Sequence, residues 1–186
     1  MARYHGGEEI DRATHSTNFT EFCLKKQMDS KLLLIRIGLI ALYAGLVIGG
    51  FCIPGFGMYL GVVIILAVII AAYFTWPLTN IEYEYVTASG DITFTTIYGG
   101  GKKRKDNLKF KIKDCEIIAP YTSEYADKYA SIANVYDFRS SVKQTSDVYF
   151  MVIGDKKVLF QCTNKALKIF KSYNKENTVS VDTLVY

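Results

Sequence analysis

Residues 32–76 form two long apolar runs that contain a single charged residue, Arg36. The runs cover about 32–53 and 56–76 and are separated by a short turn at Pro54. A helix needs about 20 apolar residues to cross a hydrocarbon core of roughly 30 Å. Because lipid cannot satisfy free backbone groups, no other spanning structure fits a pair of such runs. The sequence therefore predicts a membrane protein with a transmembrane helical hairpin over 32–76.

Basic residues flank this stretch and are missing from its connecting turn. Lys25, Lys26 and Lys31 precede the first run, and a basic segment at residues 102–105 follows the second. Because positively charged flanks favour the cytoplasmic side, we expect both termini in the cytoplasm and two spans in the cell membrane. We expect Arg36, one turn inside its helix, to extend toward the cytoplasmic headgroups, and a functional intramembrane charge is the alternative.

Small residues recur every four positions in both apolar runs. Such spacing lets helix backbones approach closely. A two-helix hairpin needs one small-residue face for its own packing, and a leftover face would serve an oligomer or a partner helix. The candidate helix-packing residues are Ala41, Gly45, Gly49, Gly57 and Gly61. Since the middle of each run lacks acidic and strongly polar side chains, a transport path is not expected.

Residues 1–31 are interpreted as a cytoplasmic head. Residues 1–16 are polar and without periodicity, for which disorder is the default. Phe19, Phe22 and Cys23 then recur at helical spacing. This spacing predicts a short interfacial helix, and a partly ordered linker is the alternative.

From Ile81 the periodicity changes to two, which predicts strands. We expect a hairpin of two strands around Ser89-Gly90, a strand over 108–112 and a short strand over 115–119. A second hairpin is expected over 147–162, and a weak last strand over 179–186.

A long segment, 120–146, is rich in tyrosine and is expected to be a loop with one or two helical turns around 124–131. Apolar residues from Ala166 to Tyr173 at helical spacing, after a cap at Thr163 or Asn164, predict an amphipathic helix. Residues 78–186 are thus expected to form a cytoplasmic, mainly antiparallel β domain closed by a C-terminal amphipathic helix.

The chemistry-bearing residues do not form a catalytic or metal-binding pattern. The four cysteines, Cys23, Cys52, Cys115 and Cys162, lack the close repeated spacing of zinc sites and disulfide frameworks, so we expect reduced thiols. Both histidines lie in the polar head, away from any serine or cysteine of the β domain. The GGGKKRK segment lacks the Ser or Thr that a phosphate-binding Walker loop requires. We expect no enzyme, cofactor, metal or nucleic-acid ligand.

The same basic segment suits a different partner. Lys102, Lys103, Arg104 and Lys105 follow a glycine-rich turn. Such clusters bind anionic lipid headgroups with about 1 kcal/mol per basic residue. We interpret the segment as a candidate contact with anionic lipid, and a solvated loop is the alternative.

The order of elements resembles the pleckstrin-homology (PH) superfold, in which antiparallel strands precede one C-terminal helix. The segments FTEFCLKK, IEYEYVTASGDI and CEIIAPY, with the helical hairpin and a late VYF strand, also resemble a family of small uncharacterised two-span membrane proteins from clostridia-like Gram-positive bacteria. This resemblance implies a PH-like cytoplasmic domain of unknown function and implies no activity.

Two functions remain after these exclusions. In the first, a PH-like binding or scaffolding domain is held at the inner leaflet and contacts lipid or a partner protein through a sheet edge or the tyrosine-rich segment. In the alternative, the chain is a small accessory subunit of a larger membrane complex and associates through its transmembrane helices.

Overall fold

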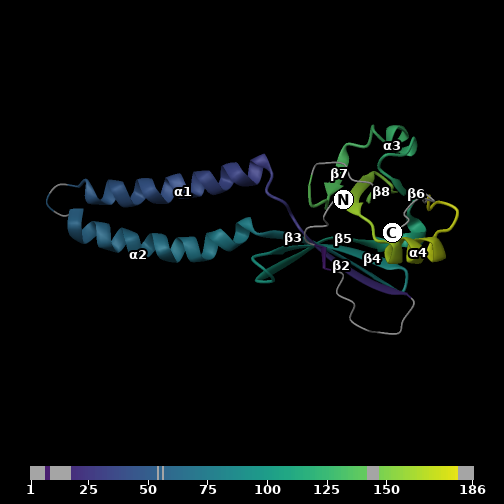
Figure 1. The fold of residues 1–186 in the computed structure, drawn as a ribbon, viewed down its shortest axis with the longest axis horizontal. Helices are drawn as coiled ribbons and strands as arrows, with labels where there is room; N and C mark the ends of the chain where they lie inside the picture. The colour runs from purple at the N-terminus through teal and green to yellow at the C-terminus, as the bar shows by residue number, and fades with distance from the viewer. Residues whose placement is uncertain (1–6, 9–17, 54, 56, 142–146, 180–186) are drawn as a thin grey trace, which may run out of the picture. The chain divides into compact units, whose positions relative to one another are not determined.

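The computed structural model describes residues 7–8, 18–53, 55, 57–141 and 147–179. The chain divides into two compact units (Figure 1). The helical unit comprises residues 28–81 and 98–103, and the β-rich unit comprises residues 1–27, 82–97 and 104–186.

The helical unit consists mainly of two long helices, α1 (Ser30–Phe51) and α2 (Gly57–Thr75), which lie side by side in Figure 1. Asp29 caps α1 by accepting a 2.8 Å hydrogen bond from the Leu32 backbone N–H. α2 ends where a short 3₁₀ helix, η1 (Trp76–Thr79), begins, because Pro77 cannot continue an α-helix. Both helices are long and apolar enough to cross a membrane, so the predicted pair of helices is confirmed. That they cross a membrane stays a prediction.

Contact between α1 and α2 uses only part of the predicted small-residue pattern. A Cβ atom on Gly57 would lie 2.5 Å from the Phe51 carbonyl oxygen, and one on Gly61 would lie 2.6 Å from the Phe51 ring. These two glycines therefore lie in the helix–helix contact. Ala41 is exposed, and a Cβ atom on Gly45 or on Gly49 would meet no atom within 4 Å. The α1 residues of the pattern thus face away from α2.

The first sheet has five strands in the order β1-β2-β3-β4-β5. Ser89 and Gly90 both have positive φ, 52° and 87°, in the tight turn between β3 and β4, and this hairpin confirms the prediction. The last strand begins at Lys103, five residues before the predicted start at Leu108. The bounds of these strands are Gly7–Glu8 for β1, Phe19–Lys25 for β2, Ile81–Ala88 for β3, Asp91–Tyr98 for β4 and Lys103–Lys111 for β5.

The predicted interfacial helix around Phe19–Cys23 was wrong, because this segment is strand β2. Thr20, Phe22 and Leu24 are 1%, 3% and 4% exposed, which is a period of two rather than 3.6. β2 pairs antiparallel with β3, and Phe22 lies opposite Tyr85. Burial of this face in the sheet outweighs the helical spacing of the two phenylalanines. The remaining head residues, 1–6 and 9–17, lie outside the described part of the chain.

The second sheet has four strands in the order β6-β8-β9-β7. Gly154, with φ 53°, is in the tight turn of the predicted β8–β9 hairpin, which is confirmed. The segment predicted as a long loop contains the one-turn helix α3 (Tyr125–Lys128), as expected, and also a strand that the sequence analysis missed. This strand, β7, pairs parallel with β9. The bounds are Ile117–Pro120 for β6, Asn134–Asp137 for β7, Val148–Ile153 for β8 and Lys156–Gln161 for β9.

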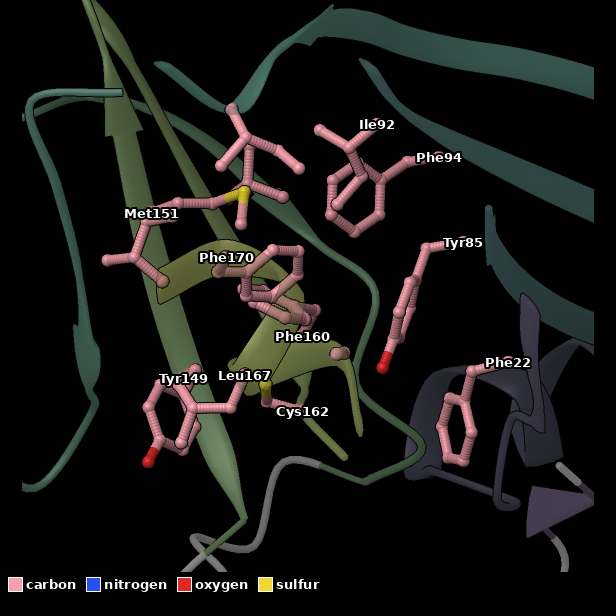
Figure 2. Close-up of a cluster of buried hydrophobic side chains, with 14 of the residues drawn as sticks. Phe22, Tyr85, Ile92, Phe94, Tyr149, Met151, Phe160, Cys162, Leu167 and Phe170 are labelled. Atoms are coloured by element: carbon pink, nitrogen blue, oxygen red, sulfur yellow. The ribbon is translucent and has the colours of Figure 1, made fainter. Parts of the chain in front are cut away.

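The main core of the β-rich unit lies between the inner faces of both sheets and the helix α4 (Asn164–Tyr173), as Figure 2 shows. Thr163 caps α4, as predicted, by accepting a 3.2 Å hydrogen bond from the Ala166 backbone N–H. Ring contacts join Tyr85, Phe94 and Phe160 across the core. The closing role expected of α4 stays a prediction.

Two short segments, one after β5 and one after α4, lie close to β6. A 3₁₀ turn, η2 (Ile112–Asp114), follows β5, and Asn174 donates hydrogen bonds of 3.0 and 2.8 Å to the carbonyls of Ile112 and Cys115. Beyond α4 the chain forms an isolated parallel bridge between Thr178 and Ile118. The expected strand over 179–186 lies almost wholly outside the described residues.

Candidate functional site: the base of the helical hairpin

Arg36 binds the end of α2 through its guanidinium group. Its Nε donates a 3.1 Å hydrogen bond to Thr79 Oγ1, and Nη2 donates to the Thr79 carbonyl at 3.3 Å and to Asn80 Oδ1 at 2.8 Å. The planar fork of donors suits such a set of diverging acceptors better than the single ammonium of a lysine. Arg36 therefore connects α1 to the segment that ends the hairpin, which we call the hairpin base (residues 73–80).

The partners of Arg36 within the described residues are uncharged. Its remaining contacts are a 3.6 Å hydrogen bond from Nη1 to Met28 Sδ and a position over the Trp76 ring, 5.7 Å from the centroid. Since no carboxylate among the described residues pairs with the guanidinium, Arg36 brings an uncompensated positive charge to the hairpin base.

The turn between β4 and β5 packs against the hairpin base within the helical unit. Gly99 donates a 2.9 Å backbone hydrogen bond to the Asn80 carbonyl. A Cβ atom on Gly99 would lie 2.8 Å from Pro77 Cβ, and its φ is 64°, so glycine suits both the conformation and the close approach. Lys102, in the same turn, holds its ammonium 4.5 Å from the centroid of the Tyr73 ring. The basic turn is thereby placed at the end of α2.

The four predicted lipid-contact residues have different surroundings. Lys102 and Lys103 belong to the helical unit, whereas Arg104 and Lys105 belong to the β-rich unit. Arg104 forms an ion pair with Glu84, whose side chain is almost completely buried. The charge of Arg104 is therefore compensated, while the side chains of Lys102, Lys103 and Lys105 are exposed and have no ion pair among the described residues.

Aromatic side chains surround the same end of α2. Tyr73 and Phe74 are largely exposed and contact each other edge to face at 5.3 Å between ring centroids. Trp76 follows under the Arg36 guanidinium. Aromatic rings and cations at one helix end are typical of the boundary between hydrocarbon and water. The sequence analysis identified Arg36 and the basic segment at residues 102–105 but missed Thr79 and Asn80, for which the break at Pro77 was the available signal.

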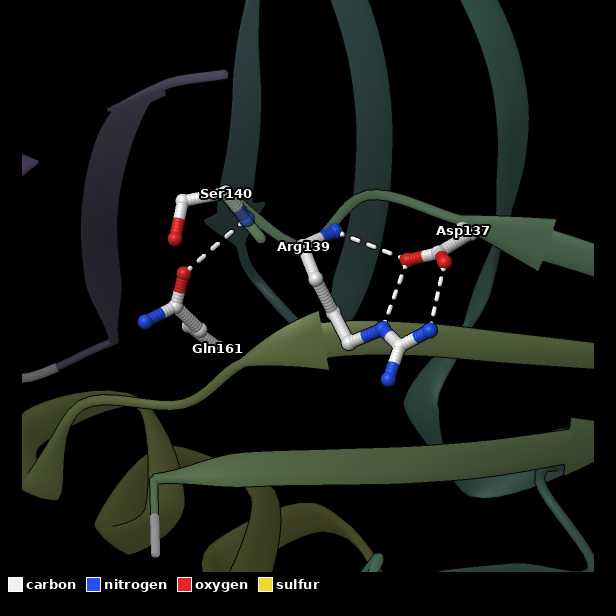
Figure 3. Close-up of polar contacts among 4 residues, drawn as sticks. All are labelled: Asp137, Arg139, Ser140 and Gln161. Carbon is white, nitrogen blue, oxygen red and sulfur yellow. Dashed lines mark hydrogen bonds and ion pairs between the residues drawn. The ribbon is translucent and has the colours of Figure 1, made fainter. Parts of the chain in front are cut away.

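The tyrosine-rich segment, predicted as a contact surface, packs against the β-rich unit. Tyr121, Tyr125 and Tyr129 are half-buried against the outer face of the second sheet, and Tyr136 packs on the main core. Figure 3 shows how the segment after β7 is held in place. Arg139 donates to both carboxylate oxygens of Asp137, and the Ser140 N–H donates a 3.1 Å hydrogen bond to Gln161 Oε1.

The thiols of the β-rich unit are poor nucleophiles at neutral pH. Burial, with the nearby carboxylates of Glu82 and Glu84, raises the pKa of Cys23 to about 11. Burial raises the pKa of Cys115 to about 12 and raises that of Cys162 as well. Because the thiolate is the reactive form, these cysteines are suited to packing rather than to covalent chemistry.

Comparison with known proteins supports the PH-like interpretation. Residues 16–180 match the family described as "Bacterial PH-like domain (DUF6106)". No curated protein and no solved structure matched the chain. The match includes β2, which the structure places in the first sheet, as well as both long helices and α4. The chain belongs to this family of bacterial PH-like domains, whose function is unknown.

Proposed function

We propose that this protein is a membrane-anchored, non-enzymatic binding or scaffolding protein whose PH-like domain is held at the inner leaflet by the helical hairpin, with both termini in the cytoplasm. The contact of Lys102 with Tyr73 is the observation that carries the proposal most directly. It fixes a basic turn of the sheet beside the aromatic end of an apolar helix, which is where anionic headgroups would lie if α2 spans the bilayer.

Exposure of the apolar helices supports the anchoring role. Leu34, Ile48 and Ile69 have more than half of their surface exposed, and many other large apolar side chains of α1 and α2 are similar. Exposed apolar surface of this extent is unfavourable in water and favourable in lipid. The hairpin therefore fits a hydrocarbon environment better than an aqueous one.

Three basic residues of the helical unit support contact with anionic lipid. Arg36, Lys102 and Lys103 belong to the same unit and have no carboxylate partner among the described residues. Each basic residue near an anionic surface contributes about 1 kcal/mol, which corresponds to roughly a fivefold preference for anionic over neutral lipid.

Trp76 is the single tryptophan of the chain and lies at this base, so its fluorescence reports on the surrounding lipid. The full chain is placed in phosphatidylcholine nanodiscs that contain a small fraction of brominated phosphatidylcholine or brominated phosphatidylglycerol. We expect both to quench Trp76 and the anionic lipid to quench it more. The full chain is required because residues 78–186 alone would lack β2.

Charge reversal at Lys102 and Lys103 tests the basic turn. The double variant Lys102→Glu, Lys103→Glu is expected to abolish the preference for the anionic lipid. Reversal of two exposed lysines of the β-rich unit, Lys168→Glu and Lys175→Glu, changes the net charge equally and is expected to preserve it. Equal quenching by the two lipids excludes the headgroup contact, and absence of quenching by either excludes the membrane anchor.

A second function is favoured by the exposed small residues of α1. Ala41, Gly45 and Gly49 face away from α2, so close helix approach on this side is open to a partner helix or a second copy. The chain would then be an accessory subunit of a membrane complex. Replacing all three residues by Leu should remove a stoichiometric membrane partner from detergent pull-downs while Leu42→Ala does not. Retention of every partner by the triple variant excludes this function.

A further inference from the structure

The outer face of the second sheet contains a pocket of about 300 Å³ between β7, β9 and the α3 segment. Apolar side chains line it together with Asp127 and one lysine of β9, and most of its exposed wall surface is polar. A volume of this size is at the lower end for small-molecule sites. Its lining includes Tyr121, Ala130, Ile132, Val135, Lys157 and Leu159.

Lys157 is buried although it is a lysine. It is 6% exposed and lies on the same face of β9 as Leu159. Its ammonium donates hydrogen bonds to the carbonyls of Ala126, at 3.3 Å, and Tyr129, at 3.2 Å, at the end of α3. The rings of Phe150 and Tyr121 lie 4.9 and 5.7 Å from the nitrogen. Carbonyls and aromatic rings thus contact the ammonium, and Lys157 also lines the pocket.

This cation has no carboxylate within ion-pair distance among the described residues. A buried charge is normally paired, because removing an ion from water is costly. Burial accordingly lowers the pKa of Lys157, and the more distant Asp127 offsets this effect only in part. An ammonium has three N–H donors, and the two carbonyls account for two of them.

We propose that this pocket binds a small monocarboxylate, whose carboxylate pairs with the Lys157 ammonium and whose apolar end contacts Ile132, Val135 and Leu159. The carboxylate supplies the missing counter-charge and an acceptor for the third N–H. Asp127 also lines the pocket and disfavours a ligand with two negative charges. The site lies within the β-rich unit, so it does not rest on the membrane anchor proposed above.

Binding at this pocket would also act on α3. Since Lys157 already connects β9 to the end of α3, a carboxylate on Lys157 would strengthen that connection. The tyrosine-rich segment would then be ordered more firmly on the sheet when the acid is bound, which makes the PH-like domain responsive to a small metabolite of this class.

The test is a titration of the full chain in nanodiscs with butyrate, followed by the ¹³C-methyl signals of Ile132, Val135 and Leu159. We expect a saturable shift of these signals. Butyramide has the same shape without the charge and is expected to bind at least tenfold more weakly, as is inorganic phosphate. Lack of a saturable shift with butyrate, or equal binding of butyramide or phosphate, overturns the proposal.

Variants separate the pocket from general effects. Lys157→Met should weaken butyrate binding at least tenfold, whereas Lys156→Met, next to it on the strand, should leave binding unchanged. Ala130→Phe fills the pocket from an exposed wall position while keeping Lys157, so it tests the site even if Lys157→Met does not fold. Binding that survives Ala130→Phe, or that is weakened equally by Lys156→Met, rejects the site.

Discussion

The helical hairpin and the core of the β-rich unit are built from the same kinds of apolar residue and expose them to opposite degrees. Val148, Val152 and Val158 are buried almost completely, whereas Leu34, Ile48 and Ile69 are more than half exposed. The β-rich unit hides its apolar side chains within its own structure. The hairpin exposes most of its apolar side chains. Its stability therefore depends on whether lipid or water surrounds it.

Phe94→Ala tests how much the buried core stabilises the β-rich unit. Phe94 is fully buried, and its ring contacts those of Tyr85 and Phe160 (Figure 2). It also stacks on the ring of Phe138. The substitution leaves a cavity and should lower the free energy of unfolding of the β-rich unit by about 3–5 kcal/mol. Urea denaturation in detergent micelles measures it. Leu34→Ala, on the hairpin, should change the same transition by less than about 0.5 kcal/mol, and a similar loss in both variants removes the distinction.

Burial in the β-rich unit should also be visible in the reactivity of the Cys23 thiol. The pKa of Cys23 is raised from 9.0 to about 11, so its thiolate fraction at pH 8 is reduced about a hundredfold. Its alkylation by a maleimide should accelerate about tenfold per pH unit from pH 8 to pH 10, because the thiolate is the reacting form. Mass spectrometry of the labelled chain gives the rate. A rate that levels off between pH 9 and pH 10, as expected for a thiol with the unshifted pKa of 9.0, is the opposing outcome.

Within the hairpin, the two sets of glycines should respond differently. A Cβ atom at Gly57 would approach the Phe51 carbonyl to 2.5 Å, so Gly57→Ala should cost about 1–3 kcal/mol of hairpin stability. Gly45→Ala meets open space and should be neutral or stabilising, since alanine favours the helix. Denaturation by sodium dodecyl sulfate, followed by the Trp76 signal, compares them. Equal effects would show that the α1–α2 contact is not the one described.

The smallest effect is expected at the hairpin base. Arg36→Gln removes the charge-assisted hydrogen bonds to Thr79 and Asn80 and should cost about 1–2 kcal/mol locally. The backbone N–H of Asn80 donates to the Pro77 carbonyl, and its hydrogen exchange should be faster in this variant because the segment opens more easily. Arg36→Lys should restore little of the protection because it lacks the fork of donors. Full restoration by lysine would assign the effect to charge alone.

Elements whose signal lies within one continuous stretch of residues were predictable from the sequence. The hairpin helices follow from long runs without charge, the β3–β4 hairpin from alternation around Ser89-Gly90, and α4 from its cap at Thr163. β2 was misread because its residues satisfy helical and strand spacing at once, and only its pairing with β3 decides between them. β7 has four residues and a parallel partner, so its local signal is weak.

The sequence indicated which residues could form the candidate site but not which of them contact one another. The basic turn and the aromatic helix end were both visible, but the contact of Lys102 with Tyr73 joins segments that are distant in the chain. The ion pair of Arg104 with Glu84, which removes one cation from the cluster, depends on strand pairing in the same way. The environment of Lys157 depends on the α3 segment, whose carbonyls it contacts, and the local sequence of β9 carries no signal for it.

Topology is the claim on which the proposed function depends, and the exposed Cys52 at the end of α1 can report it. In intact cells that produce the Cys23→Ser variant, Cys52 is the one exposed cysteine, because Cys115 and Cys162 are buried. A membrane-impermeant maleimide should label Cys52 from outside without permeabilisation. In a matched variant with Cys23→Ser, Cys52→Ser and the exposed Thr122→Cys, labelling should require permeabilisation. Labelling of Thr122→Cys from outside, or of Cys52 only after permeabilisation, would show that the hairpin does not hold the PH-like domain at the inner leaflet.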